Sequence, residues 1–278
     1  MRAAAVQLNS NENKERNLAA ADELTRAAAS DGAQLVVLPE KFNLLGTHEH
    51  YEQGAETLDG HTITWARETA AELGIDLVAG SIVERREGRE KFSNTCVHIS
   101  PDGDIRAVYR KIHMFDVVVG EVEYKESASE APGDEIVVSE LGDGEPLGLT
   151  VCYDLRFPEL FRILAIKGAT VISLPAAFTK ITGEAHWEIL IRARAIENQV
   201  FVVAAGQVGV HPEGKESWGH SMIVDPWGKI LAQVEGDVPG FCTADLDFHR
   251  QAEVRDKLPS LANRQAAAYT WPEEAGVS

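Results

Sequence analysis

The sequence predicts an α/β fold in which mixed β-sheets are covered by helices. Helical patterns alternate with buried strand patterns in both halves of the 278-residue chain, which favours parallel strands joined by helices. Two strong hairpin turns, at 101–103 (Pro-Asp-Gly) and 225–228 (Asp-Pro-Trp-Gly), require antiparallel neighbours as well. No linker, low-complexity tract or repeat divides the chain. Two helix-covered mixed sheets packed together would use these elements well.

The elements of the first half follow from periodicity and from glycine stops. A strand is predicted over 3–8, and the next segment, 14–29, has a helical spacing of apolar residues that ends before Gly32. Gly74 stops a second helix in the same way. The other predicted elements of this half are a strand over 34–38, that second helix over about 62–73, and strands over 76–83, 94–100 and 104–109.

The second half repeats this alternation after a short apolar run, 147–151, that stops at Cys152. A run of this kind indicates a buried strand that leaves the core at a polar turn. The elements predicted beyond it are helices over about 158–167 and 184–199, strands over 170–174, 200–207, 221–225, 229–234 and 240–245, and a last helical segment from about Asp247.

Composition narrows the class of protein. Hydrophobic residues make up 44% and charged residues 25% of the chain, which is ordinary for a globular protein with a substantial core. A net charge of −18 without a basic cluster argues against a nucleic-acid partner. The N-terminus turns polar by Asn9, and no apolar stretch is long enough for a bilayer, so no membrane association is expected. Three cysteines do not form a disulfide framework, and the cytoplasm is the expected location.

Three chemically useful side chains follow predicted strand ends. Cys152 closes the run at 147–151, Glu40 follows the strand at 34–38, and Lys111 follows the strand at 104–109. A thiol at such an edge can be reached by a small molecule, whereas one inside the strand could not. A thiol, a carboxylate and an amine at three strand ends therefore suggest one catalytic pocket.

These groups together can carry out acyl transfer to sulfur. Glu40 could take the proton of Cys152 and later return it to a leaving amine. Lys111 could stabilise the thiolate and then the oxyanion, and the backbone N–H of Tyr153 is placed to be a second oxyanion donor. The implied intermediate is a thioester, which water then hydrolyses.

The motifs around these residues resemble the nitrilase (carbon–nitrogen hydrolase) superfamily, in which a Glu-Lys-Cys triad occurs in this order. They are Leu38-Pro39-Glu40-Lys41-Phe42, Tyr109-Arg110-Lys111-Ile112-His113 and Cys152-Tyr153-Asp154-Leu155-Arg156-Phe157-Pro158-Glu159. The resemblance extends from about residue 5 to residue 269 and looks closest to the Nit branch, on segments 183–188, 192–199 and 218–228.

The resemblance implies a four-layer α-β-β-α sandwich with two mixed sheets, formed by a single domain over 1–278 with its core at about 1–269. It implies no metal or organic cofactor, and a homodimer or higher homo-oligomer. The implied activity is hydrolysis of a small linear amide to a carboxylate and ammonia. Segments 173–178 and 202–207 favour deaminated glutathione as the substrate, with 2-oxoglutaramate, the substrate of omega-amidase, as the alternative.

The resemblance also implies a second glutamate, and Glu126 occupies the matching position. Its expected role is to fix the Lys111 ammonium. Phe178 and Thr179 follow a strand's carboxyl end, where α/β proteins commonly bind ligands, and are expected to line the pocket. His186 is a further candidate for substrate binding. No His, Cys or Asp cluster has metal-ligand spacing.

Two other classes of protein fit less well. A papain-like cysteine peptidase needs a histidine base and an aromatic-rich cysteine motif, and neither is evident around Cys152. A non-catalytic scaffold that kept the fold would have no need for Glu40, Lys111 and Cys152 together.

Overall fold

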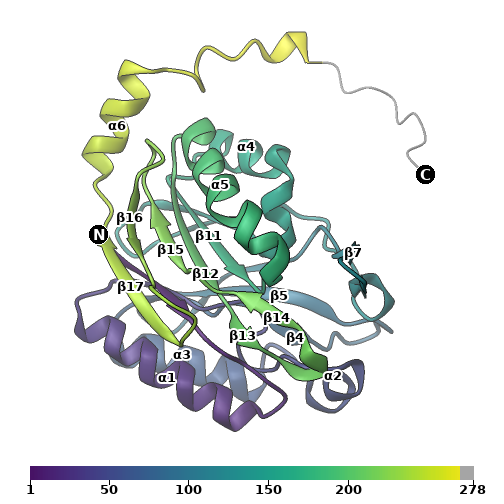
Figure 1. The fold of residues 1–278 in the computed structure, drawn as a ribbon. Coiled ribbons are helices and arrows are strands. Elements are labelled where there is room, and N and C mark those ends of the chain that lie inside the picture. The colour runs from purple at the N-terminus through teal and green to yellow at the C-terminus, as the bar shows by residue number, and fades with distance from the viewer. Residues whose placement is uncertain (270–278) are drawn as a thin grey trace.

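Two β-sheets packed face to face form the centre of the computed structural model, which describes residues 1–269 (Figure 1). The first sheet has seven strands, in the order β17 (Gly240–Asp245), β1 (Arg2–Gln7), β2 (Leu35–Val37), β3 (Asp76–Val78), β5 (Ser93–Ile99) and β4 (Ile82–Glu84), with β6 (Ile105–Arg110) also paired to β5. The second has six, in the order β16 (Ile230–Gln233), β15 (Met222–Val224), β12 (Phe201–Gly206), β11 (Val171–Ala176), β10 (Pro146–Leu149) and β9 (Val138–Glu140).

Both sheets are mixed, as the sequence predicts. Strands β1, β2 and β3 run parallel, and β17, β5 and β6 are antiparallel to their neighbours. In the second sheet β10, β11 and β12 run parallel, whereas β9, β15 and β16 pair antiparallel. The parallel strands are buried on both faces and consequently have nearly continuous apolar sequences.

Side chains of β1 alternate between two hydrophobic layers. Ala3 and Ala5 point toward the second sheet, while Ala4 and Val6 contact the helices on the outer face. That face is covered by α1 (Lys14–Ser30) and α3 (His61–Leu73). The outer face of the second sheet is covered by α4 (Pro158–Ile166) and α5 (Lys180–Asn198). The layer order is therefore α-β-β-α, and α6 (Phe248–Lys257) follows β17 at the edge (Figure 1).

Two predicted boundaries were wrong. The segment 76–83 forms two strands, β3 and β4, because the chain turns at Gly80 with φ of +42°. A Cβ there would lie 2.0 Å from the carbonyl oxygen of Pro39, so this glycine lets the loop that carries Glu40 pack closely. The helix predicted from about residue 184 begins earlier, at Lys180.

Several short elements were not predicted. They are α2 (His48–Gly54), the hairpin of β7 (Asp116–Val119) and β8 (Val122–Lys125), the hairpin of β13 (Val208–Val210) and β14 (Glu216–Trp218), and single 3-10 turns at Glu126–Ala128, Cys152–Arg156, Pro212–Gly214 and Ala266–Ala268. Over residues 1–269, the model has no helix with the length and hydropathy needed to cross a membrane.

Candidate active site

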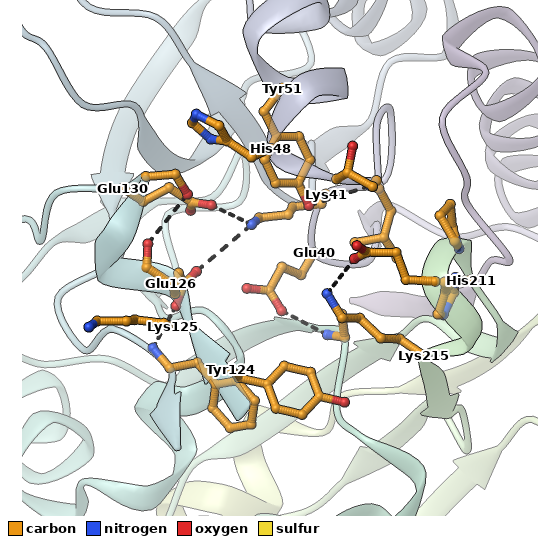
Figure 2. Close-up of a pocket in the computed structure, with 18 of the residues that line it drawn as sticks. Glu40, Lys41, His48, Tyr51, Tyr124, Lys125, Glu126, Glu130, His211 and Lys215 are labelled. Atoms are coloured by element: carbon orange, nitrogen blue, oxygen red, sulfur yellow. Dashed lines mark hydrogen bonds and ion pairs between the residues drawn. The ribbon is translucent and has the colours of Figure 1, made fainter. Parts of the chain in front are cut away.

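The three strand ends singled out in the sequence meet in one cavity of about 360 Å³. Glu40 follows β2, Lys111 follows β6 and Cys152 follows β10, and all three side chains line this cavity. Glu126, at the start of the 3-10 turn after β8, lines it too. Figure 2 shows the Glu40 and Glu126 side chains directed into the same space between the loops. The structure thus brings a thiol, an amine and two carboxylates together.

Lys111 is held between two glutamates. Its Nζ donates to Glu40 Oε1 at 3.0 Å, to Glu126 Oε2 at 2.8 Å and to Glu126 Oε1 at 3.0 Å. The side chain is only 2% exposed, so these charge-assisted bonds compensate for the loss of hydration. The ammonium therefore has a fixed position in the cavity wall.

Further donors fix the two carboxylates. Asn94 Nδ2 bridges Glu40 Oε1 at 2.8 Å and Glu126 Oε1 at 3.0 Å. The backbone N–H of Ala177 donates to Glu40 Oε2 at 2.8 Å, and that of Phe115 donates to Glu126 Oε2 at 2.7 Å. Each carboxylate oxygen therefore has at least one partner, which restricts the rotation of both groups.

The electrostatics of the cavity keep the thiol protonated and the amine charged. Burial and the nearby Glu40 carboxylate raise the pKa of Cys152 well above its usual range, against the opposing effect of the Lys111 charge. Burial alone would lower the pKa of Lys111, but the Glu126 and Glu40 carboxylates outweigh it and raise that pKa. Burial would raise the pKa of Glu126, yet the Lys111 and Lys41 ammonium groups bring it down to about 2. The resting site holds a neutral thiol beside an ion-paired lysine.

The backbone of Cys152 is in the left-handed region, with φ of 47°. Non-glycine residues rarely adopt this conformation, and it persists only where the surroundings enforce it. The residue is 7% exposed, so the thiol opens onto the cavity and not onto bulk solvent. The positive φ turns the chain sharply out of β10 and presents the side chain to the cavity.

Asp154 enforces this turn. Its carboxylate is fully buried and accepts from the Val151 N–H at 2.8 Å, the Tyr109 hydroxyl at 2.7 Å and His113 Nδ1 at 2.7 Å. The His113 ring also stacks on Phe157, with ring centroids 3.5 Å apart. His113 therefore acts as a hydrogen-bond partner in the wall behind the cysteine turn.

Asp154→Asn should destabilise the protein, because an amide cannot accept from donors on both sides of the group. We expect a free energy of unfolding lower by about 1–3 kcal/mol and a clear fall in kcat. Thermal unfolding and amide turnover, measured beside Asp102→Asn in an exposed surface turn, check this. Equal behaviour of the two variants would contradict the role given to Asp154.

The remaining predicted residues lie at different distances from the cavity. Thr179 lines it, whereas Phe178 packs on Trp187. His186 lies on α5, and its Nδ1 is 3.3 Å from Nη1 of Arg156. Neither Phe178 nor His186 contributes to the lining. Tyr153 is not among the residues that line the cavity, and within residues 1–269 its backbone N–H donates to no protein acceptor.

Sequence reasoning missed three polar residues of the site. Asn94 is the second residue of β5, and Lys41 and Glu130 are charged residues outside the named strands and helices. All three are buried, and Lys41 and Glu130 line the cavity. The part of the chain described by the structure contains no group of three or more His, Cys, Asp or Glu side chains placed to hold a metal ion.

The chain is similar to known amidases over nearly its whole length. The family model described as carbon-nitrogen hydrolase matches residues 2–256. The chain is 41% identical over 265 residues to the deaminated glutathione amidase of Synechocystis sp., covering 94% of this chain and 97% of that protein. It is 39% identical over 262 residues to the omega-amidase NIT2-B of Xenopus laevis, covering 94% of each.

Solved structures share the fold. Nit3 of Saccharomyces cerevisiae, a member of branch 10 of the nitrilase superfamily, aligns with a TM-score of 0.85 at 30% identity over 96% of both chains. A variant of the amidase from Nesterenkonia sp. AN1, solved with acrylamide added at its active-site cysteine, aligns with a TM-score of 0.79 at 28% identity over 96% of this chain and 97% of that one. The four-layer sandwich is therefore the nitrilase fold, and the chain belongs to the carbon–nitrogen hydrolase family as an amidase of its Nit branch.

Proposed function

We propose that this protein hydrolyses its amide substrate through a thioester on Cys152. The observation that carries the proposal is the Lys111 ammonium, fixed between Glu40 and Glu126 in the cavity that the thiol lines. This arrangement supplies a nucleophile, a base and a fixed positive charge in one place.

In the first half-reaction the proton of the Cys152 thiol passes to Glu40 as sulfur bonds to the amide carbon. The negative charge moves to the carbonyl oxygen, where the Lys111 ammonium and the Tyr153 N–H stabilise it. Collapse of this intermediate breaks the C–N bond, and Glu40 delivers its proton to the leaving nitrogen. The raised pKa of the thiol fits this order, because the thiolate forms only as the proton moves to Glu40.

In the second half-reaction water attacks the thioester and gives a proton to Glu40. The C–S bond breaks, the acid is released, and the proton returns from Glu40 to the thiolate. Glu126 holds Lys111 in place throughout, since both of its oxygens lie within 3.0 Å of Nζ. Each proton taken up by Glu40 is thus returned within the cycle.

Deaminated glutathione is the substrate we propose first, and 2-oxoglutaramate is the second candidate. Relatives named for each amidase support them, at 41% and 39% identity. Both substrates would give the same 2-oxo acyl group on sulfur. Their leaving groups differ, because deaminated glutathione releases cysteinylglycine and 2-oxoglutaramate releases ammonia.

The kcat/KM values for the two substrates test this assignment. We expect a value at least about tenfold higher for deaminated glutathione, with cysteinylglycine followed by a thiol assay and ammonia by a coupled assay. A higher value for 2-oxoglutaramate would make the protein an omega-amidase. Turnover of neither would reject both substrates.

We also propose a homodimer in the cytoplasm, with residues 1–278 forming one domain. A group of exposed apolar side chains on and beside α5 supports self-association: Ile181, Ile189, Ile196 and Trp227. The three cysteines are all free, which suits a reducing compartment. Light scattering of the purified protein would report the oligomer directly.

A further inference from the structure

A second buried ion pair lies in the wall of the catalytic cavity. Lys41 Nζ donates to Glu130 Oε1 at 2.6 Å, and both side chains line the cavity with Cys152. The two side chains are 10% and 1% exposed. Figure 2 shows Lys41 reaching from the loop that carries Glu40 toward Glu130 and Glu126. The catalytic steps given above do not use this pair.

The pair has unused hydrogen-bonding capacity on both sides. The Lys41 ammonium has three N–H donors, and its next carboxylate oxygen, on Glu126, is 4.0 Å away. Tyr51 is a further neighbour: its ring centroid is 4.6 Å from Nζ, and its hydroxyl interacts with the ammonium. Glu130 Oε2 is buried and has no hydrogen-bond partner among the described residues. A buried acceptor without a partner is costly, so this corner is suited to a polar ligand group.

The other cavity lysines are less suited to this purpose. Lys111 already donates to Glu40 and Glu126 and belongs to the reaction centre. Lys215 is 42% exposed and pairs with Glu213 at 2.8 Å, so solvent screens its charge. Lys125 also lines the cavity and is exposed. Lys41 combines burial, charge and free donors.

We propose that Lys41 and Glu130 form a subsite for a carboxylate carried by the acyl part of the substrate. The Lys41 ammonium donates to this carboxylate, and Glu130 in its protonated form donates from its second oxygen. The pair thereby selects amides with a negative charge at the end opposite the scissile bond. This inference rests on the proposed amidase function and specifies how it distinguishes substrates.

Charge balance explains why Glu130 must take up a proton. The groups that face this corner are Lys41 and Glu40 after β2, Lys111 after β6, Glu126 and Glu130 around the 3-10 turn, and the Tyr51 phenol on α2. With all the carboxylates ionised their sum is one negative charge, which opposes a further anion. Protonation of Glu130 brings the sum to zero.

Glu130 can take up this proton near neutral pH. Burial raises the pKa of Glu130 to about 7, with Lys41 opposing the rise and Glu126 adding to it. Below that pH the carboxyl is protonated and donates to the substrate. Above it the ionised carboxylate competes for Lys41, so anionic amides should bind more weakly as the pH rises.

The test compares an anionic amide with a neutral amide of the same length. We suggest glutaramate and valeramide, with kcat and KM measured from pH 6 to pH 9. Lys41→Met should lower kcat/KM for glutaramate through KM, by about 10- to 100-fold more than any change that it causes for valeramide. Lys41→Arg should recover part of the loss. Lys215→Met, at the exposed rim, is the matched control and should change neither substrate by more than about twofold.

Glu130→Gln separates recognition from a merely structural role. In the parent protein KM for glutaramate should rise with pH above about 7, by up to about tenfold per unit. Glutamine keeps a donor and an acceptor but does not titrate, so the same KM should be flat with pH. KM for valeramide should be flat in both proteins. A KM for glutaramate that keeps its pH dependence in Glu130→Gln overturns the proposal.

The double variant Lys41→Met/Glu130→Gln guards against misfolding, because it leaves no buried charge without a partner. Its kcat/KM for glutaramate should fall by at least about tenfold more than its kcat/KM for valeramide. Equal losses for both amides, or a preference of the parent protein for cationic amides, would overturn the subsite.

Failure of the amidase proposal can be told apart from failure of the subsite. If the parent protein hydrolyses neither of these amides, and neither deaminated glutathione nor 2-oxoglutaramate, the amidase function fails. Calorimetric measurement of glutarate binding to Cys152→Ala then tests the subsite without turnover. Lys41→Met in that background should weaken glutarate binding about 10-fold or more, and unchanged affinity would reject the subsite.

Discussion

Cys152→Ala should abolish amide hydrolysis, with kcat at least about 10⁴-fold lower for every substrate. The reason is that the reaction proposed here forms and breaks a C–S bond, and no other cavity side chain can replace the sulfur. The backbone turn should survive, because Asp154 anchors it through Val151, Tyr109 and His113 and not through the thiol. Product formation, measured with the enzyme in excess over the substrate, would give the residual rate of the variant.

Cys242→Ala is the matched control. This thiol is also buried, with its pKa raised to about 12 by burial, but it lies on β17 and does not line the cavity. We expect it to keep kcat within a few-fold of the parent protein. Mass spectrometry should detect an acyl adduct on the parent and on Cys242→Ala, and none on Cys152→Ala. Hydrolysis by Cys152→Ala at the parent rate would refute the thioester route.

Lys111→Met should show the second-largest effect, and it should affect both rate and stability. Loss of the oxyanion donor is expected to lower kcat by about 100- to 1000-fold. Glu40 and Glu126 would also lose the ammonium that holds them together, which leaves two buried carboxylates without their cation. Breaking a buried ion pair in this way should cost about 3–5 kcal/mol of unfolding free energy.

Parallel measurement of kcat and Tm distinguishes these two contributions. Lys111→Arg should restore much of the stability, because it keeps the charge, but little of the rate, because its planar group cannot occupy the same position. A Lys111→Met protein with the parent's Tm would show that the carboxylates do not depend on this lysine. An unchanged kcat would remove Lys111 from the reaction.

Much of the fold could be predicted because its signals are local. The buried parallel strands have continuous apolar runs, and glycines such as Gly74, with φ of 64°, end helices at the expected positions. The errors arose where a tertiary contact decided the local structure. Gly80 breaks the predicted strand 76–83 because the Pro39 carbonyl packs against it. The sequence near Gly80 does not indicate this contact.

The residues of the candidate site also divide into those that the sequence reveals and those that depend on tertiary contacts. Cys152, Glu40 and Lys111 could be found from strand ends, since each follows a strand that the sequence predicts. Lys41 and Glu130 could not, because charged residues in polar loops are usually solvated. Their burial depends on loops that are 89 residues apart in sequence and meet only in the folded chain.

The left-handed backbone at Lys41, with φ of 51°, has a consequence for how this cavity can diversify. In an extended segment, neighbouring side chains point to opposite sides, but here Glu40 and Lys41 both face the cavity. The proposed base, Glu40, and the ammonium group of the Lys41–Glu130 pair therefore belong to adjacent residues. A change in the length of this loop would move both at once, so new substrate preferences can arise here by exchange of side chains and not by insertion. The β7–β8 and β13–β14 hairpins carry neither of these two residues, so a change in their length would not alter the spacing of Glu40 and Lys41.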